Sequence, residues 1–370
     1  MMRTVAIVAP HFPEYALQYA AALSRSCKVI VCVDRGQLNA EYEGRETPAL
    51  SSSGEMITSN FKTPGDLLRL VWIIFRAKPD VLHLQEAVGP RRRFFNAVLA
   101  AVVKPFGKIA LTVHDPAPHP GRDGNEGRRA QFLRDYVRRT SDFVIVHGQY
   151  CLDQYMAVDP PARQKVILSA HGGILSPSIE GRPLDDPLRM YLFGRMESYK
   201  GIEILCQAVE ILHQQAVPFR LTIAGKGPEL DRLQSRFSKL PEVRVFNGFA
   251  PPVDVINSLQ ASHCVVMPYT SATQSGIAAA AFANHRFVIA SRIGGLVDVV
   301  TNMTNGLLVE PGDVPSLVNA IKRVAADPGL RASLMAAAKH SATTDLSWER
   351  IASDVATKFF DPPSAGGELG

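Results

Sequence analysis

Short apolar runs alternate with stretches in which apolar residues recur every three or four positions. This alternation predicts strands of parallel sheets, buried on both faces and connected by helices. In the first half the predicted strands are Val5–Ala9, Lys28–Val33, Val81–Gln85, Ile109–His114, Phe143–His147 and Lys165–Ser169. The predicted helices are Glu14–Ser24, Gly65–Ala77, Arg91–Lys104, Gly127–Arg139 and Tyr150–Ala157. The polar stretch Arg35–Pro64 predicts an irregular connection with weak edge structure.

The pattern breaks at residues 174–187, which are rich in proline and polar residues and predict a linker. It then restarts, with predicted strands at Met190–Phe193, Arg220–Ala224, Val243–Phe246, Cys264–Pro268, Phe287–Ala290 and Gly306–Val309. Predicted helices follow at Ile202–Gln214, Pro228–Phe237, Val253–Ala261, Gly276–Asn284, Val314–Ala326 and Gly329–His340. A last helix is expected to begin near Ser347 as its N-cap, with Trp348, Ile351, Val355 and Phe359 on one face.

A chain of 370 residues suits two α/β domains better than one core. We expect two Rossmann-like domains, at residues 1–173 and 188–345, followed by a helix at 346–360 and a flexible tail at 361–370. Ligands of such domains bind at the C-terminal ends of the strands. If those edges face each other, the ligand lies in a cleft between them.

The composition is 46% hydrophobic and 20% charged, which is typical of a soluble globular enzyme. The first apolar run turns directly into Pro, His and Glu, and so predicts a buried strand rather than a signal peptide. The longest apolar candidate, Leu67–Phe75, is too short to span a membrane. The five cysteines lack metal-type spacing and are interpreted as free thiols in a reducing cytoplasm. Residues 1–183 hold about six more Lys and Arg than Asp and Glu, so the net charge of +5 belongs to the N-terminal half.

The segment Tyr191–Gly201 carries the clearest candidate chemistry. A short apolar run ends at Gly194, Arg195 follows, and Lys200 comes just before a predicted helix. Two cations beside a helix N-terminus form a pocket for a phosphate or diphosphate. The alternative is that Arg195 and Lys200 are solvated cations on a surface loop.

Five ordered segments carry a resemblance to a known family: FGRMESYKGIEIL, LTIAGKGPEL, VFNGFAPPVDVINSLQASHCVVMPY, GLLVEPGDVPSLVNAI and SWERIASDVATKFF. In order and spacing they resemble the retaining glycosyltransferases of family 4, glycosyl transferases group 1, which have the GT-B fold. The resemblance covers most of residues 188–360 closely. Over residues 1–172 it is looser, mainly LTVHDP and KPDVLHL. It implies two sheets facing across a cleft and a last helix that crosses back to the first domain.

The resemblance also implies a nucleotide-sugar donor in the second domain and an acceptor mostly in the first. By position, Arg195 and Lys200 would bind the donor diphosphate. A bidentate arginine and a point-charge lysine stabilise the negative charge that grows on a departing diphosphate. The chain has no D-x-D carboxylate pair. We therefore expect metal-independent chemistry without a cofactor.

Further donor contacts are implied by the same resemblance. Gly225, Lys226 and Gly227, and then Phe246 and Gly248, would line the base pocket through backbone groups; the alternative for each glycine is a tight turn. Four residues, Thr273, Gln274, Ser275 and Gly276, open an alanine-rich helix whose free N–H groups suit a phosphate or a sugar hydroxyl.

The chain departs from the family pattern at the usual pair of glutamates eight residues apart. Their expected positions hold Ala272 and Ala280, while His285 and Phe287 replace the usual Gly and Pro. Our hypothesis is that Thr273, Gln274 and backbone amides substitute for the missing carboxylates. Asp298, where the family often has a glutamate, is either a donor contact or a solvated carboxylate.

In the first domain His114 ends a predicted strand, and the family has a histidine here near the anomeric centre of the donor sugar. The long loop after it is interpreted as an acceptor loop with His119 and Arg122 as candidates, and His11 would line the acceptor side. For His147 and His171, which also end strands, a hinge or packing role is favoured. Retention is expected by same-face attack, in which the leaving phosphate accepts the acceptor proton.

Arg91, Arg92 and Arg93 precede an apolar stretch. Its apolar residues are expected to face the domain core; the alternative is a basic helix that holds the protein weakly on an anionic membrane. Peripheral membrane association would suit a lipid-linked acceptor.

The sequence is therefore interpreted as a cytoplasmic glycosyltransferase that moves a hexose from a UDP- or GDP-sugar to a glycan or lipid-linked glycan in polysaccharide biosynthesis. Two alternatives stay open: a nucleotide-sugar-binding protein with weakened catalysis, and a nucleotide-sugar epimerase of the same fold. Nucleic-acid binding is disfavoured because no aromatic-interleaved basic stripe occurs.

Overall fold

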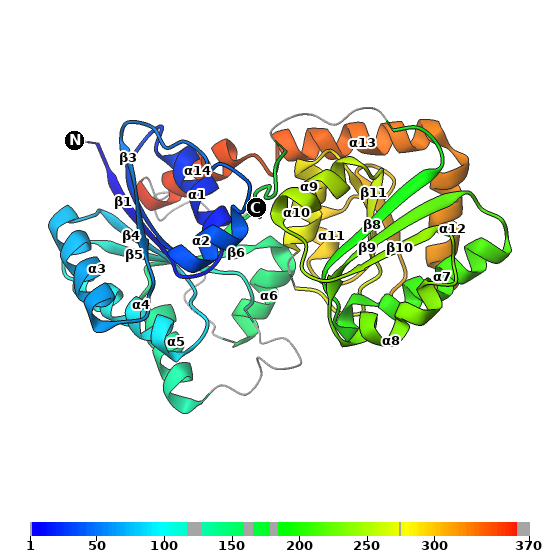
Figure 1. Ribbon diagram of the computed structural model, residues 1–370. Coiled ribbons are helices and arrows are strands. Elements are labelled where there is room, and N and C mark those ends of the chain that lie inside the picture. Colours follow the sequence, from blue (N-terminus) through cyan, green and yellow to red (C-terminus); the bar gives the residue numbers. More distant parts are fainter. Residues whose placement is uncertain (1, 117–126, 159–165, 178–183, 274, 361–370) are drawn as a thin grey trace. The chain divides into compact units, whose positions relative to one another are not determined.

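The computed structural model describes residues 2–116, 127–158, 166–177, 184–273 and 275–360 (Figure 1). The chain divides into two compact units, Met1–Gly172 with Ser347–Gly370 and Gly173–Leu346. Each unit contains one sheet whose paired strands are all parallel, with helices as connections, which confirms the expected fold class of two Rossmann-like domains.

The first unit has a seven-stranded sheet in the order β3-β2-β1-β4-β5-β6-β7. The strands are β1 Thr4–Ala9, β2 Lys28–Asp34, β3 Gly54–Ser59, β4 Val81–Gln85, β5 Lys108–Val113, β6 Phe143–His147 and β7 Val166–Ser169. The helices are α1 Pro13–Leu23, α2 Arg35–Glu41, α3 Pro64–Ala77, α4 Pro90–Val103, α5 Arg128–Thr140, α6 Gly148–Val158 and α14 Trp348–Phe360. The central strands are mostly apolar and almost fully buried because helices cover both of their faces.

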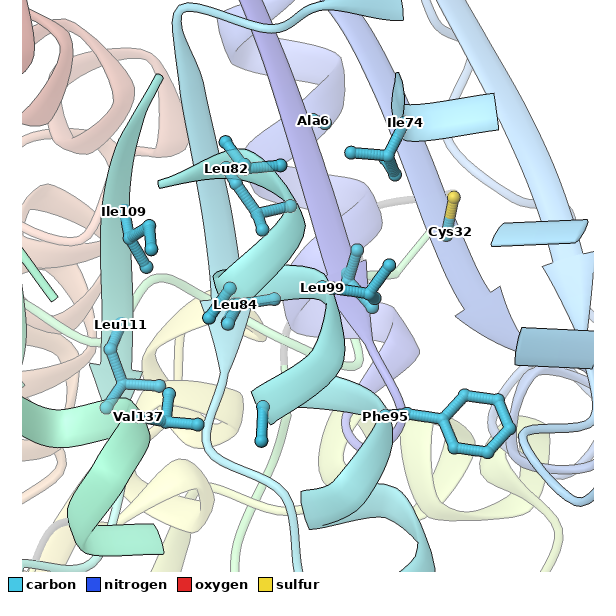
Figure 2. Close-up of a cluster of buried hydrophobic side chains, with 14 of the residues drawn as sticks. Ala6, Cys32, Ile74, Leu82, Leu84, Phe95, Leu99, Ile109, Leu111 and Val137 are labelled. Carbon is cyan, nitrogen blue, oxygen red and sulfur yellow. The ribbon is translucent and has the colours of Figure 1, made fainter. Parts of the chain in front are cut away.

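The core on one side of this sheet lies under α3 and α4. Figure 2 shows Leu99 and Phe95 of α4 and Ile74 of α3 beside strand residues such as Leu82 and Ile109. All of these side chains are buried. Burial of large aliphatic side chains is the main contribution to the stability of the unit.

The prediction for Arg35–Pro64 was wrong in part, because this stretch contains helix α2 and the edge strand β3. The side chain of Asp34 caps α2 by accepting a 3.0 Å hydrogen bond from the backbone N–H of Gln37. Strand β3 pairs with β2 along its whole length, yet only Ile57 and Ser59 of it are buried. An edge strand with so few buried positions leaves little apolar pattern in the sequence.

The second unit has a six-stranded sheet in the order β10-β9-β8-β11-β12-β13. The strands are β8 Leu188–Arg195, β9 Phe219–Lys226, β10 Val243–Asn247, β11 Cys264–Met267, β12 Phe287–Ser291 and β13 Gly306–Val309. The helices are α7 Ile202–Gln214, α8 Pro228–Phe237, α9 Pro252–Gln260, α10 Gly276–Ala283, α11 Leu296–Val299, α12 Val314–Ala326 and α13 Pro328–Thr343, with a 3₁₀ turn η3 at Ser198–Lys200. The turn η3 and the four-residue α11 were not predicted.

The last helix, α14, belongs to the first unit and packs against α1. Its predicted apolar face is confirmed, since Trp348, Ile351, Val355 and Phe359 are all buried. The ring of Trp348 meets that of Tyr15 edge-on, with ring centroids 4.9 Å apart. The hydroxyl of Ser347 accepts a 3.5 Å hydrogen bond from the backbone N–H of Arg350, as an N-cap does.

All five cysteines are free and buried, as predicted. None of the helices in the described part of the chain combines the length and hydropathy that a bilayer crossing needs.

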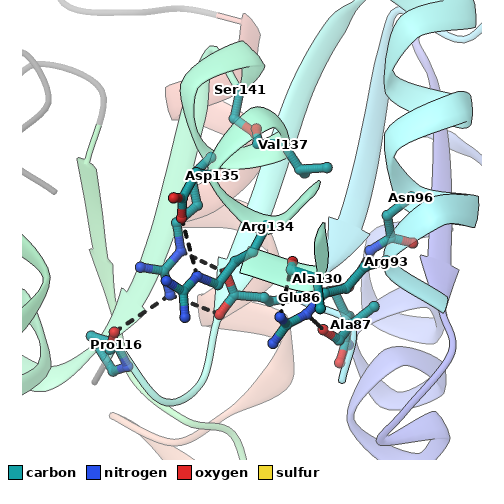
Figure 3. Close-up of polar contacts among 12 residues, drawn as sticks. Glu86, Ala87, Arg93, Asn96, Pro116, Ala130, Arg134, Asp135, Val137 and Ser141 are labelled. Carbon is teal, nitrogen blue, oxygen red and sulfur yellow. Dashed lines mark hydrogen bonds and ion pairs between the residues drawn. The ribbon is translucent and has the colours of Figure 1, made fainter. Parts of the chain in front are cut away.

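The arginine triplet at the start of α4 does not form an exposed basic surface. Arg93 is buried and donates to the backbone carbonyls of Ala87, at 2.9 Å, and Ala130, at 3.0 Å (Figure 3). Arg92 forms a 3.0 Å ion pair with Asp34. Only Arg91 is exposed, so two of the three arginines support the fold of the first unit instead of facing outward.

Candidate functional site

The candidate site of the second unit begins where β8 ends. Gly194 has a φ of +104°, Arg195 is the last strand residue, and η3 then leads to Gly201 at the start of α7. Gly201 has a φ of +65°, and a Cβ atom at that position would lie 1.8 Å from the carbonyl oxygen of Pro268. Only glycine fits there, and this close approach holds the turn that carries Lys200 against the end of β11.

Lys200 is an unusual lysine because its side chain points into the protein. The residue is only 4% exposed. Its Nζ donates a 2.8 Å hydrogen bond to the hydroxyl of Tyr269 and a 3.4 Å one to the carbonyl oxygen of Phe193. The same Nζ lies 4.8 Å from the centroid of the Tyr269 ring. The side chain of Tyr269 and the backbone carbonyl of Phe193 therefore fix the position of this ammonium group.

Burial, followed by the nearby charge of Arg195, lowers the pKa of Lys200 to about 7. Burial also raises the pKa of Tyr269, so that its hydroxyl stays protonated. Among the residues that the structure describes, no carboxylate is paired with Lys200. An anion that reached this position would restore the full charge of the lysine, because an opposite charge favours the protonated form.

Glycine at position 194 leaves one side of the ammonium open. A Cβ atom there would lie 3.3 Å from the Nζ of Lys200 and 3.4 Å from Cδ1 of Ile277. The first turn of α10, which contains Ile277, therefore lies beside the end of β8. Arg195 is exposed and pairs in register with Lys226, which is exposed at the end of β9. The structure thus brings Arg195, Lys200 and Lys226 to one edge of the sheet.

The glycine turns after β9 and β10 have a structural reason. A Cβ atom at Gly225 would lie 1.9 Å from the carbonyl oxygen of Gly194, and one at Gly227 would lie 2.5 Å from that of Met196. The backbone N–H of Gly248 donates to the carbonyl oxygen of Gly225 at 2.9 Å. Half of the Phe246 side chain is exposed at the same edge. The close backbone approach explains Gly225 and Gly227 whether or not they also face a ligand.

At the start of α10 the hydroxyl of Ser275 accepts a 3.3 Å hydrogen bond from the N–H of Ala278, so Ser275 acts as the N-cap and Gly276 is the first helical residue. Thr273 is buried, and its carbonyl oxygen accepts a 2.7 Å hydrogen bond from the N–H of Gly295. Gln274 lies outside the described residues.

The two positions without glutamates are both buried, at Ala272 and Ala280. His285 has a φ of +59°, a left-handed conformation that glycine adopts more readily than other residues. Phe287 is buried in β12, and Asp298 is exposed.

In the first unit His114 follows β5 directly and is buried. Its Nε2 lies 3.1 Å from Oε1 of Gln85, at the end of the neighbouring strand β4. The imidazole ring is 4.9 Å from the ring of Tyr15 and 4.8 Å from that of Phe12, measured between centroids. Burial lowers the pKa of His114 well below its usual value, which keeps the ring neutral.

His147 and His171, which end β6 and follow β7, join His114 in one cluster. The ring centroids are 5.1 Å apart for His114 and His147 and 5.2 Å apart for His147 and His171. Burial lowers the pKa of His147 to about 3 and that of His171 to about 4. Three neutral imidazoles therefore pack around Tyr15 at the C-terminal edge of the first sheet.

His11 follows β1 at the same edge and is half-buried, with its Nε2 3.2 Å from the carbonyl oxygen of Val88. Burial and the charge of Arg92 lower its pKa. His119 and Arg122 lie outside the described residues.

Three side chains that contact Lys200 or His114 were not predicted from the sequence. Tyr269 is hydrogen-bonded to Lys200, Gln85 is hydrogen-bonded to His114, and the ring of Tyr15 packs against that of His114. Tyr269 and Gln85 stand at or just after the ends of strands, and that position was the signal that could have found them.

Comparisons with known proteins show which family and which solved structures this chain is similar to. Residues 187–327 match the model of the family Glycosyl transferases group 1. The glycogen synthase of Mycobacterium tuberculosis is 25% identical over 288 residues, which are 75% of this chain and 68% of that protein.

Solved structures match over nearly the whole chain. Sucrose-phosphate synthase from Thermosynechococcus elongatus has a TM-score of 0.71 at 19% identity, covering 96% of this chain and 98% of that chain. HepE of Anabaena, solved in complex with UDP, has a TM-score of 0.68 at 16% identity, covering 96% and 99%. These likenesses give the chain the GT-B fold. Together with the family match and the relative, they support a glycosyltransferase.

Proposed function

We propose that this glycosyltransferase moves a hexose from a UDP- or GDP-sugar to a glycan or lipid-linked glycan acceptor, with retention and without a metal ion. The second unit holds the donor, and the first unit holds the acceptor. A cytoplasmic role in polysaccharide biosynthesis follows from this proposal.

The observation that carries the proposal is the buried Lys200 beside the exposed Arg195. Both are at the C-terminal edge of a parallel sheet, where α/β domains bind ligands. Lys200 is fixed by Tyr269 and by the backbone, so it does not have to reorganise when charge develops. Arg195 can bind two phosphate oxygens through its planar guanidinium group. This pair suits the departure of a nucleoside diphosphate.

Donor recognition then falls to the remaining groups at this edge. Lys226, Phe246 and the turns at Gly225–Gly227 and Gly248 line the base and ribose. Thr273, Gln274 and the backbone amides at Ser275 and Gly276 take the place of the glutamates that Ala272 and Ala280 lack. Donor contacts of this kind agree with the UDP bound to the HepE neighbour.

In the first unit, we assign His114 to the region near the anomeric carbon of the donor sugar. A neutral imidazole there can accept one hydrogen bond from a sugar hydroxyl at Nδ1, since its Nε2–H donates to Oε1 of Gln85. His11, His119 and Arg122 are assigned to the acceptor side. The leaving phosphate takes the acceptor proton, so the reaction needs no separate protein base.

The test measures release of nucleoside diphosphate from UDP-, GDP- and ADP-sugars, with and without EDTA, for the wild type and for Arg195→Ala and Lys200→Ala. We expect turnover with one uracil or guanine donor that survives EDTA and falls by about 100-fold or more in each variant. Turnover that is unchanged in both variants, or lost in EDTA, would contradict the proposal.

A second candidate is a donor-binding protein with weakened catalysis, favoured by the two buried alanines at 272 and 280. It predicts a thermal shift with the nucleotide sugar but neither transfer nor hydrolysis. An epimerase of the same fold would instead convert the sugar while leaving the nucleotide attached, so product analysis separates the three activities.

A further inference from the structure

Helix α3 has two apolar faces, and only one of them is used by the core. Leu70 and Ile74 are buried in the first unit. Leu68, Trp72 and Phe75 are 69%, 60% and 56% exposed, respectively. Their spacing of four and three residues places them on one side of the helix, away from the core. We call these three residues the α3 stripe.

The surroundings of the α3 stripe add aromatic groups. Phe106, just after α4, is partly exposed, and its ring centroid is 6.2 Å from that of Phe75. Helices α3, α4 and α5 lie next to one another in the first unit (Figure 1). Phe94 of α4 and Phe132 of α5 are exposed as well. Exposed aromatic side chains on three neighbouring helices indicate an interaction surface.

The same three helices are strongly basic. Their sequences contain ten arginines and two aspartates, with no lysine or glutamate, which gives a net charge of +8. Several of these arginines form contacts within the first unit, such as the ion pair of Arg138 with Glu86. The exposed ones are Arg69, Arg76, Arg91, Arg128, Arg129 and Arg139. The guanidinium of Arg76 lies over the ring of Trp72, 5.3 Å from its centroid.

We propose that the α3 stripe inserts into the headgroup region of an anionic lipid bilayer, with Arg69, Arg76 and the exposed arginines of α4 and α5 facing the lipid phosphates. Trp and Phe beside Arg on a helix that does not span the membrane are the features of an interfacial helix. The long arginine side chains can reach the phosphates while their stems lie along apolar surface.

A bilayer fits this surface better than a protein partner does. The stripe is one side chain wide, whereas a stable protein interface buries about 800 Å² on each partner. An anionic bilayer complements the net charge of +8 on these helices, over an area wide enough for all three of them. Of the arginine triplet only Arg91 belongs to this surface, since Arg92 and Arg93 face inward.

This inference goes beyond the transferase proposal, because binding to vesicles needs neither donor nor acceptor. The two proposals can therefore fail separately. If both hold, the stripe brings the acceptor unit to the surface where a lipid-linked glycan resides.

Tryptophan fluorescence of the chain itself can report the binding of the α3 stripe to vesicles. It has two tryptophans: Trp348 is 8% exposed, whereas Trp72 is in the α3 stripe. The full chain is mixed with vesicles of phosphatidylcholine alone and with vesicles in which about a third of the lipid is phosphatidylglycerol. Flotation and tryptophan emission are measured. We expect flotation and a blue-shifted emission with the anionic vesicles only, and loss of both at high salt because salt screens the arginines.

Two variants separate the apolar from the electrostatic contribution. The triple variant Leu68→Ser, Trp72→Ser, Phe75→Ser should weaken vesicle affinity at least about 10-fold. The double variant Arg69→Glu, Arg76→Glu should abolish the preference for anionic lipid. The matched control changes three exposed apolar residues elsewhere in the first unit, Met56→Ser, Val158→Ser and Leu168→Ser, and should float like the wild type.

Circular dichroism and thermal unfolding establish that each variant is folded, which is expected because all the changed side chains are exposed. Flotation by the triple variant equal to that of the wild type would overturn the proposal. A wild-type chain that does not bind anionic vesicles would also overturn it. If sedimentation then showed a dimer of the wild type but not of the triple variant, the stripe would be a contact between two copies of the chain.

Discussion

The hydroxyl of Tyr269 accepts a 2.8 Å hydrogen bond from the Nζ of Lys200, and both residues are buried. Tyr269 follows β11 and Lys200 precedes α7, so this one bond joins two βα connections at the edge of the second sheet. The hydrogen bond matters because burying an ammonium group with few partners lowers the stability of the folded protein. A site that keeps such a group in place is prepared for an anion.

Replacing Tyr269 by Phe tests this link. The change keeps the ring beside Lys200 but removes the hydrogen-bond acceptor, which leaves the ammonium with the long contact to Phe193 only. Hydrogen bonds to charged groups contribute about 1.5–3 kcal/mol, so kcat/KM for the donor should fall by about 10- to 100-fold. Steady-state kinetics at saturating acceptor measure the effect.

The matched control is Tyr191→Phe, which removes a buried tyrosine hydroxyl from β8 of the same sheet. It should leave kcat/KM within about twofold of the wild type, since surface and core changes away from a site rarely alter transition-state contacts. Equal losses in the two variants would mean that Tyr269 acts only through the stability of the unit.

Lys200 should take up a proton when the donor binds. The pKa of Lys200 is about 7 in the empty site, so much of this lysine is neutral at pH 8. A bound diphosphate favours the charged form and raises the pKa. Calorimetric titration of a nucleotide sugar at pH 8, in two buffers of different ionisation enthalpy, should show uptake of nearly one proton and an affinity that weakens toward pH 9.

In that experiment Lys200→Ala should bind the donor more weakly and with no proton uptake. Arg195→Ala should also bind more weakly but retain the uptake, because Lys200 is still present. Identical heats in both buffers for the wild type would remove Lys200 from the diphosphate site.

The same lysine should limit the stability of the protein. Its folded pKa of about 7 is below the usual 10.5, so its contribution to stability is greatest above pH 10.5 and is lost as the pH falls toward 7. Lys200→Met should therefore raise the free energy of unfolding at pH 7 by about 1–4 kcal/mol, while turnover is lost. Urea denaturation at pH 7 and pH 10 measures the gain, which should shrink at the higher pH. A less stable variant at pH 7 would show that the pocket tolerates the charge without cost.

Much of the fold could be predicted because it depends on burial alone. The runs that became β1, β4 and β6 are mostly apolar and buried at nearly every position, as expected for strands covered on both faces. Strand β3 could not be predicted, because only Ile57 and Ser59 of it are buried and its partner strand supplies the rest of its stabilisation. The GT-B fold followed from motif order, which the structure confirms.

The site could be predicted only as far as single positions go. The sequence placed Arg195 and Lys200 after the same strand, but it gave no sign that one is exposed and the other buried. That difference depends on Gly201 meeting Pro268 and on the distant Tyr269, 69 residues along the chain. The sequence also placed His114, His147 and His171 at strand ends and favoured a hinge or packing role for the last two, but it did not predict that the three rings contact one another.

The histidine cluster should make the first unit sensitive to acid. His147 and His171 have folded pKa values of about 3 and about 4, below their ordinary value of 6.5. Their contribution to stability is therefore complete above pH 6.5 and is lost as the pH falls toward 4. His147→Phe keeps an aromatic ring in the cluster but removes one of these groups. Between pH 6.5 and 4 its unfolding free energy should fall less steeply than that of the wild type, by about 1.4 kcal/mol per pH unit.

Chemical denaturation at pH 7, 6, 5 and 4 measures these slopes. Replacing the exposed His340 of α13 by Phe is the control, and it should leave the wild-type slope nearly unchanged. Parallel curves for the wild type and His147→Phe would mean that His147 takes up its proton in the folded protein.

Gly201 should be the least replaceable glycine of the candidate site. Alanine there would have to adopt a φ of +65° and place its Cβ 1.8 Å from the carbonyl oxygen of Pro268. Gly312 provides the matched control, since its φ is +75° and no atom lies within 4 Å of an added Cβ. Gly312→Ala should cost only the backbone strain of about 1 kcal/mol, whereas Gly201→Ala should cost about 3 kcal/mol or more because η3 must move away from β11.

Thermal unfolding compares the two variants, and donor binding by Gly201→Ala should weaken as well, since Lys200 is the last residue of η3. Equal losses of stability in the two variants would show that η3 is not pressed against β11, and the buried position of Lys200 would then need another cause.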